Sequence, residues 1–247
     1  MSGKLFYSVG GNDALAYAVA ILKKQGLSFS DTPHMAVSHL LLAAPATVPD
    51  GVLEKLPQDI TVIGGNLDDD RLSSYKKIDL LKDPIYLSEN ACITAYCAIG
   101  QATRRLPVTL QHCPVLVIGW GRIGKCLAQL LKQMCANVTV AARKETDIAT
   151  LTSLNYNVLY TQDLASHVGQ YRLIFNTAPA MVLGEEESSH CSKDCLKIDL
   201  ASRLGMSGQD VIWARGLPAK DAPQSSGELI AKTILRLLDK QEKGVSQ

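Results

Sequence analysis

Six consecutive residues, Gly119-Trp120-Gly121-Arg122-Ile123-Gly124, restrict the folds open to this chain more than any other segment. They follow an unbroken apolar run over residues 115–118, which is typical of a parallel strand buried on both faces. Apolar residues then recur at helical spacing over residues 123–134, and residues 137–141 predict a second strand. Strand, G-x-G-x-x-G, helix and strand within about 30 residues indicate a Rossmann unit.

Each glycine of this segment is expected to have a separate structural role. Gly119 permits the tight turn out of the strand, Gly121 lets a pyrophosphate approach the backbone, and Gly124 lets the helix pack close to the sheet. The helix start offers free N–H groups and a positive dipole end to an anion. We therefore expect residues 119–124 to bind a dinucleotide. The alternative is a glycine-rich turn in the same fold that binds nothing.

The residues at the end of the second strand indicate which dinucleotide the chain binds. It reads Ala142-Arg143-Lys144, without the acid that usually holds the ribose 2′-hydroxyl of NAD. Arg143 and Lys144 are suited to a 2′-phosphate, so NADP(H) is favoured over NAD(H). The alternative is that both are ordinary solvated surface cations.

Short apolar runs alternate with helical patterns along the whole chain, which predicts the α/β class. Strands are expected at residues 5–9, 39–44, 60–63, 172–176, 196–200 and 211–214, and further helices at 13–24, 88–106 and 225–238. We expect two domains: a smaller N-terminal α/β domain over residues 1–87 and a Rossmann domain with a doubly wound parallel sheet over residues 108–247. A helix over residues 88–107, capped by Ser88, bridges them, and the second domain includes the C-terminal helix.

Composition excludes several classes of function. The 247 residues have a net charge of +1 and are only 5% aromatic, which argues against a nucleic-acid or membrane-surface partner. No apolar run reaches the ~18 residues of a membrane span, and the start lacks a signal-peptide pattern, so a cytoplasmic protein is expected. The seven cysteines include no C-x-x-C pair, and His190, Cys191 and Cys195 lack a second ligand pair, so no metal site is expected.

Several segments together resemble the A subunit of dipicolinate synthase. They read VLVIGWGRIGKCLAQLL, LIFNTAPAMVL, KIDLASRLG and ARGLPAKDAPQSSGELI, and the similarity is dense from about residue 89 to residue 238. The resemblance implies NAD(P)-dependent oxidation of a dihydrodipicolinate-type precursor, a small dicarboxylate. It also implies that the partner is the second, flavoprotein-like B subunit of dipicolinate synthase, and that the location is the mother-cell cytoplasm of a sporulating bacterium.

The resemblance and the positions after the strands together suggest the site. The pyrophosphate would lie at residues 119–124, and the adenosine ribose at Ala142, Arg143 and Lys144. The nicotinamide end would be bordered by a larger set: Asn176, Thr177, Ala178, Pro179, Ala201 and Pro218. Candidate substrate residues are Asn90, Thr94, Ser202 and Arg203, with Arg203 the first candidate for a carboxylate anchor. None of the five histidines has a neighbour pattern that marks a proton acceptor, so the catalytic residue is unassigned.

The sequence departs from the family pattern beside the expected substrate cleft. The bridging helix has Ile93 and Tyr96 in place of a proline and an acid, and Gly205-Met206 replaces a double glycine. Two alternatives therefore stay open: a non-catalytic NADP-binding regulatory subunit, and a different small-carboxylate dehydrogenase. The apolar surface of the last helix is compatible with a homo-oligomer.

Overall fold

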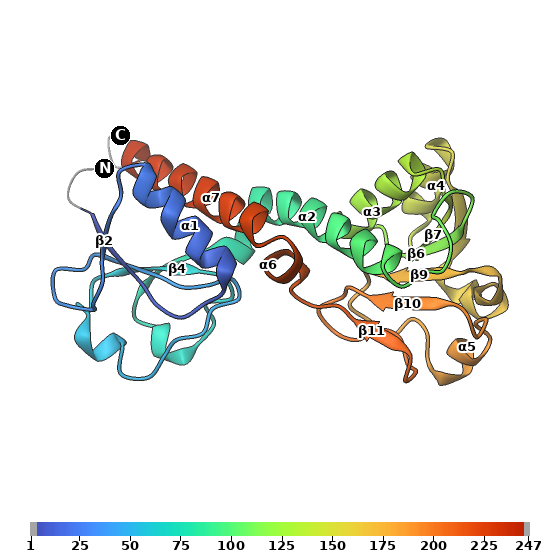
Figure 1. Ribbon diagram of the computed structural model, residues 1–247, viewed down its shortest axis with the longest axis horizontal. Helices are drawn as coiled ribbons and strands as arrows, with labels where there is room; N and C mark the ends of the chain where they lie inside the picture. The colour runs from blue at the N-terminus through green and yellow to red at the C-terminus, as the bar shows by residue number, and fades with distance from the viewer. Residues whose placement is uncertain (1–3, 245–247) are drawn as a thin grey trace. The chain divides into compact units, whose positions relative to one another are not determined.

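The structure is a computed structural model that describes residues 4–244. The chain divides into two compact units, one formed by Met1–Asn90 with Pro218–Gln247 and the other by Ala91–Leu217. Each unit has its own β-sheet, and every strand pair in both sheets is parallel (Figure 1). The predicted α/β class with a Rossmann-type second sheet is confirmed.

The sheet of the first unit has five strands in the order β2-β1-β3-β4-β5. Their bounds are β1 Leu5–Ser8, β2 Ser28–Ser30, β3 His39–Leu41, β4 Thr61–Gly64 and β5 Lys76–Asp79. The helices of this unit include α1 Asp13–Lys24 and α7 Pro223–Gly244, and α6 Leu217–Asp221 begins at its boundary. Short 3₁₀ turns lie at η1 Leu53–Lys55, η2 Asp70–Leu72 and η3 Leu80–Lys82. Apolar side chains from the central strands, such as Phe6, Leu40 and Val62, are fully buried and form its core.

The sheet of the second unit has six strands in the order β11-β10-β9-β6-β7-β8. Their bounds are β6 Pro114–Ile118, β7 Asn137–Ala142, β8 Asn157–Tyr160, β9 Leu173–Asn176, β10 Leu196–Asp199 and β11 Val211–Trp213. The helices are α3 Arg122–Gln133, α4 Glu145–Ser153 and α5 Glu185–Ser189, with η4 Thr161–Ser166 and η5 Val168–Gln170. The strand order reverses between β6 and β9, where a dinucleotide-binding sheet opens its crevice.

The helix predicted over residues 88–107 is α2 Pro84–Thr103, so it begins and ends four residues earlier than expected. Ser88 is not its cap, because the Ser88 hydroxyl donates to the Pro84 carbonyl from within the first turn. Asp83 takes that place: its carboxylate accepts from the Tyr86 backbone N–H at 2.7 Å. Pro84 has no N–H to satisfy and is suited to the first helical position.

The C-terminal helix requires a second correction. We predicted that residues 218–247 belong to the Rossmann domain, but α7 groups with the first unit, where it packs along α1 (Figure 1). A Cβ at Gly227 would come within 2.6 Å of the Ala14 carbonyl oxygen, so only glycine permits this close approach. Ion pairs from Lys232 to Glu89 and from Arg236 to Asp83 also join α7 to the first unit.

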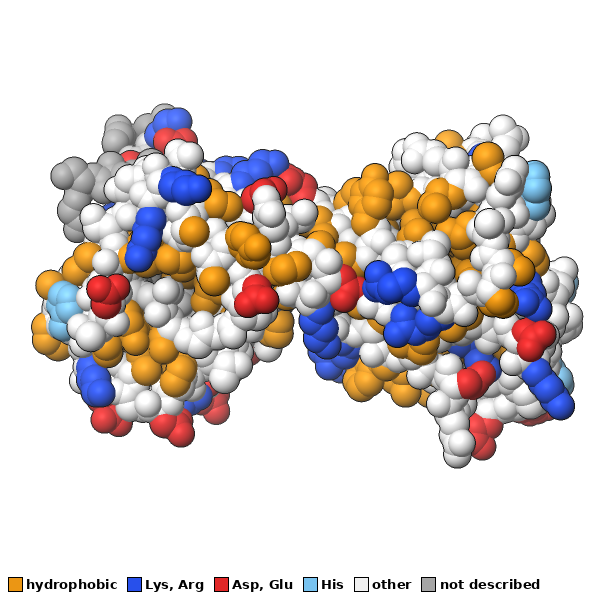
Figure 2. All heavy atoms as spheres, viewed as in Figure 1, with side chains coloured by type: hydrophobic (Ala, Val, Ile, Leu, Met, Phe, Trp, Pro, Cys, Tyr) orange, Lys and Arg blue, Asp and Glu red, His pale blue; other side chains and the backbone are white. Residues whose placement is uncertain are grey.

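The surface of each unit is mixed in charge. Figure 2 shows basic and acidic side chains on both units, with hydrophobic side chains scattered between them. Among the described residues, no helix is both long enough and apolar enough to cross a lipid bilayer.

Candidate functional site

The elbow between β6 and α3 has the geometry of a phosphate-binding turn. Gly119 adopts a φ of +103°, which side chains other than glycine rarely accept, and a Cβ there would meet the Thr177 hydroxyl at 2.6 Å. A Cβ at Gly124 would collide with the Gly119 carbonyl oxygen, so α3 approaches the end of β6 as closely as a backbone can. In contrast, a Cβ at Gly121 would have no atom within 4 Å, so the backbone there faces open space.

The first turn of α3 supplies donors at this elbow. Gly121 is the N-cap residue, and within residues 4–244 no side chain caps the helix. The backbone N–H groups of Arg122, Ile123 and Gly124 therefore lack the intrahelical partners that later residues have. Together with the helix dipole, they provide a site for an anion such as a pyrophosphate.

Exposed cations lie at the end of β7. Ala142 is buried at the strand end, whereas Arg143 and Lys144 are exposed and precede α4. Neither cation has a carboxylate partner in the described part of the chain. This edge of the elbow is therefore suited to a second phosphate group.

A buried polar network joins the loops that follow β9 and β10. Asp199 and Asn176 are both fully buried, and the Asn176 side-chain amide donates to Asp199 Oδ2 at 3.0 Å. Asp199 also accepts from the backbone N–H groups of Ala201 at 2.9 Å and Gly205 at 2.7 Å. Asn176 exchanges two further hydrogen bonds with the backbone of Ala178. The network thus holds both loops in fixed positions beside the carboxyl ends of the strands.

The loop after β9 is also tied to the elbow. The Thr177 hydroxyl donates to the Ile118 carbonyl at 3.0 Å, and the Thr177 backbone N–H donates to the same oxygen at 2.8 Å. The ends of β6, β9 and β10 are therefore linked by hydrogen bonds into one continuous edge of the second sheet.

The structure brings most of the predicted site residues to this edge. The residues gathered there are Gly119, Trp120, Gly121, Arg122, Ile123, Gly124, Ala142, Arg143, Lys144, Asn176, Thr177, Ala178, Pro179, Ala201, Ser202 and Arg203. Thr94 is buried on α2 of the second unit, whereas Asn90 and Pro218 belong to the first unit. The Asn176 side-chain amide is already bonded inside the protein, so its contribution to the predicted cofactor site would be to hold the loop after β9 in position.

Sequence reasoning missed Asp199 as a member of the site. The residue ends the run Leu-Lys-Ile-Asp, where an acid looks like an ordinary strand terminus. The available signal was an acid at the ligand-binding end of a doubly buried strand, a position where a carboxylate needs partners.

Titratable groups with strongly shifted pKa values lie away from the elbow. Burial lowers the pKa of His39, in β3 of the first unit, to about 4. A hydrogen bond from Cys195 lowers the pKa of the Cys191 thiol to about 7, but this pair precedes β10 at the opposite end of that strand from the site. The described residues contain no cluster of three or more side chains arranged to hold a metal ion.

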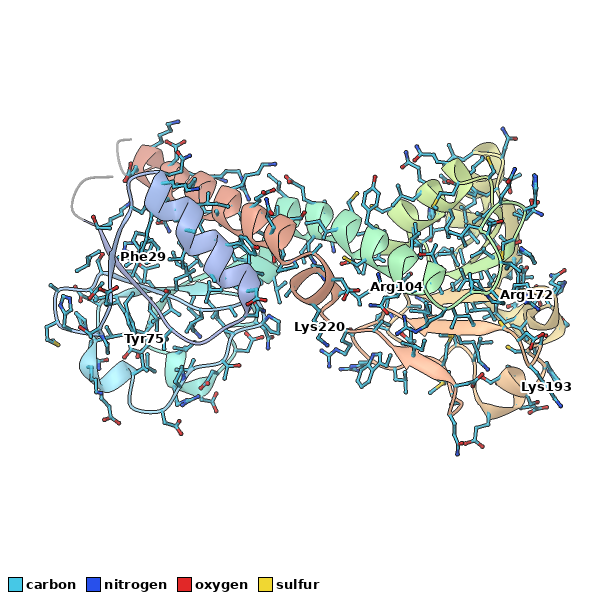
Figure 3. The ribbon with its side chains drawn as sticks, viewed as in Figure 1. Phe29, Tyr75, Arg104, Arg172, Lys193 and Lys220 are labelled. Carbon is cyan, nitrogen blue, oxygen red and sulfur yellow. The ribbon has the colours of Figure 1, made fainter. Side chains whose placement is uncertain are left out.

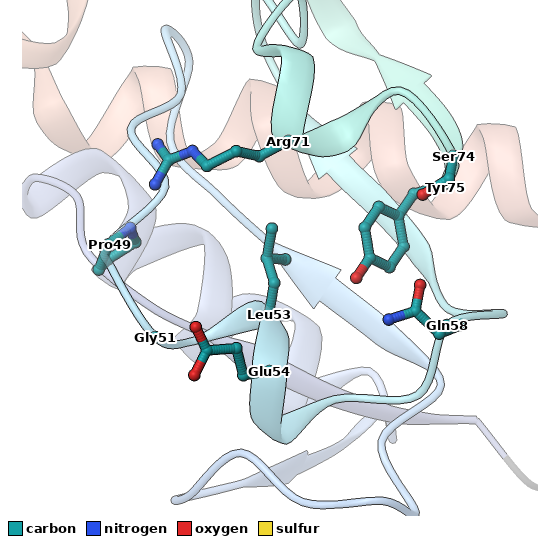
Figure 4. A pocket seen from close by; sticks show the side chains of 8 residues that line it. All are labelled: Pro49, Gly51, Leu53, Glu54, Gln58, Arg71, Ser74 and Tyr75. Carbon is teal, nitrogen blue, oxygen red and sulfur yellow. The ribbon is translucent and has the colours of Figure 1, made fainter.

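A separate hollow of about 370 Å³ lies in the first unit, lined by Pro49, Gly51, Leu53, Glu54, Gln58, Arg71, Ser74 and Tyr75 (Figure 4). Its one cation, Arg71, is already bound to Asp69 and Asp50 and to the Val48 carbonyl. With its charge neutralised, this hollow offers less to an anionic ligand than the elbow does.

The fold and the elbow define an α/β protein whose second parallel sheet is of the Rossmann type. No protein-family model matches the chain. It is 26% identical over 244 residues to the A subunit of dipicolinate synthase from Bacillus subtilis (strain 168), an alignment that covers 85% of this chain and 81% of that protein. The resemblance to this dipicolinate synthase component, predicted from the sequence, is thus confirmed.

Solved structures agree with this similarity. The A subunit of dipicolinate synthase from Bacillus halodurans superposes with a TM-score of 0.87 at 20% identity, over 96% of this chain and 98% of the other. A transhydrogenase from Sinorhizobium meliloti superposes with a TM-score of 0.75 at 12% identity, over 96% of this chain and 94% of the other. At these identities the superpositions establish a shared fold.

The Asp199 network yields a stability prediction. Asp199→Asn replaces one acceptor oxygen with an NH₂ donor, so at least one buried N–H group loses its hydrogen-bond partner. We therefore expect the free energy of unfolding to fall by about 1–3 kcal/mol. Asp194→Asn is the matched control, because that carboxylate is 75% exposed in a surface pair with Arg172. Chemical denaturation of both variants is the measurement, and equal losses would contradict the role given to Asp199.

Proposed function

We propose that this chain is an NADP(H)-dependent dehydrogenase that acts as the A subunit of a dipicolinate synthase. The observation that supports this most is the elbow, where Gly121 faces open space in front of the uncapped start of α3. The similarity to the Bacillus subtilis protein supports the choice of substrate, a dihydrodipicolinate-type dicarboxylate. The ring would lose a hydride to the nicotinamide and a proton to a base or solvent, and become aromatic.

The remaining residues receive proposed roles from their positions. Thr177, Ala178, Pro179 and Ala201 follow β9 and β10, where the nicotinamide half would lie, and Pro218 stays a candidate for the same end. Ser202 and Arg203 are exposed after β10, and Arg203 is our candidate carboxylate anchor. Asn90 and Thr94 are kept as substrate candidates on α2. The flavoprotein-like B subunit is the proposed partner, and the cytoplasm of a sporulating mother cell is the proposed location.

Cofactor preference depends on Arg143. We expect Arg143→Ala to weaken NADPH binding about 10- to 100-fold, because a charge-assisted hydrogen bond contributes about 1.5–3 kcal/mol. NADH binding should be nearly unchanged, since NADH has no 2′-phosphate. Calorimetric titration with both nucleotides measures this, and Lys193→Ala, before β10 on the same unit (Figure 3), controls for the loss of one charge. Equal losses for NADPH and NADH would refute the 2′-phosphate role.

The reaction itself is tested by mixing the chain with dihydrodipicolinate and NADP⁺ or NAD⁺, in the absence and in the presence of the flavoprotein-like partner. We expect reduced nicotinamide and dipicolinate to form in equal amounts, faster with NADP⁺. Tight NADPH binding without turnover in either mixture would instead favour the regulatory role, which the Tyr96 departure motivates. Turnover confined to other small carboxylic acids would favour a different dehydrogenase.

A further inference from the structure

Strand β11 ends in a tryptophan that is fixed but not buried. Trp213 is the last residue of β11, and 46% of it is exposed, which is unusual for the largest apolar side chain. Its indole N–H donates to the Ala201 carbonyl oxygen at 3.1 Å, so the ring is tied to the loop that follows β10. The exposed ring is therefore held in a defined position beside Ser202 and Arg203.

A guanidinium group without a carboxylate partner lies over this ring. The Cζ atom of Arg215 is 5.1 Å from the Trp213 ring centroid, within the range of a cation–π contact. Arg215 is exposed, and no carboxylate of residues 4–244 pairs with it, in contrast to Arg172 and Arg236, which both face aspartates. The aromatic contact leaves its N–H donors available to an anion.

The strand order puts this pair on the substrate side of the site. In the register of β10 and β11, Asp199 lies opposite Trp213, so residues 201–203 and Arg215 leave the sheet at the same edge. The adenosine half of a dinucleotide lies toward β7, and the nicotinamide half toward β9 and β10. A substrate next to the nicotinamide would then lie at the ends of β10 and β11.

We propose that Trp213 and Arg215 form a subsite for a planar, ring-conjugated carboxylate. Arg215 would donate hydrogen bonds to the carboxylate, while the Trp213 ring would pack against the flat ring that bears it. A saturated, puckered ring with the same carboxylates would keep the ion pair and lose the flat contact. This subsite rests on the proposed function, and it would allow the enzyme to select planar rings over puckered ones.

The test measures binding of two probes of equal charge, benzene-1,3-dicarboxylate and its saturated counterpart cyclohexane-1,3-dicarboxylate, which differ in the planarity of the ring. Titrations use the full chain with saturating NADPH, without and with the flavoprotein-like partner. The wild type should prefer the planar probe, and Arg215→Gln should weaken both probes about tenfold or more, as expected for loss of a charge-assisted hydrogen bond. Trp213→Leu should remove most of the preference for the planar probe. Trp213→Phe, which keeps a flat ring, should retain part of it.

A matched control variant makes the result specific. Arg172→Gln removes an arginine that precedes β9, at the opposite end of the strands (Figure 3), and should leave both affinities unchanged.

The outcomes separate this subsite from the proposed function. If NADPH binds but the planar probe does not, or binds equally well to the Arg215→Gln and Trp213→Leu variants, the subsite is wrong and the nucleotide site stands. If NADPH itself does not bind to the wild type, the proposed function fails first. Unfolding curves recorded for each variant show whether a lost affinity reflects a lost fold.

Discussion

The close approach of α3 to the end of β6 is the constraint on which the rest of the site depends. Gly124 and the Gly119 carbonyl leave no room for a side chain between helix and strand. Because the helix starts this close, its unpaired N–H groups lie at the carboxyl edge of the sheet. An anion bound there would be stabilised by both the N–H groups and the helix dipole.

The loops around the elbow are ordered by buried hydrogen bonds. Asp199 and Asn176 use their polar atoms to fix the chain after β9 and β10. This arrangement leaves the outward-facing side chains of Arg203 and Arg215 exposed for a ligand. In the proposed site these two tasks are separate: the buried groups fix the positions of the loops, and the exposed cations would offer charge to a substrate.

Much of the second sheet was predictable from sequence, because β6 and β9 are continuous apolar runs and the glycine fingerprint marks the turn between β6 and α3. The strands we missed, β2, β5 and β8, are short and contain polar residues, so their pairing depends on neighbouring strands rather than on their own pattern. The sequence predicted a C-terminal helix with an apolar surface, but not that α1 packs against it. The sequence marks Asp199 as an acid at the end of a buried strand, but it does not reveal its hydrogen bond to Asn176, which is 23 residues away.

The most direct test of the account is nucleotide binding by a Gly121→Ala variant. A Cβ at this position would have no neighbour within 4 Å, and φ is −81°, so the protein should fold and unfold like the wild type. The added methyl group would occupy space that the pyrophosphate needs, and we expect NADPH affinity to fall about 100-fold, equivalent to losing one or two charge-assisted hydrogen bonds. A folded Gly121→Ala protein that binds NADPH as tightly as the wild type would contradict the dinucleotide site at this elbow.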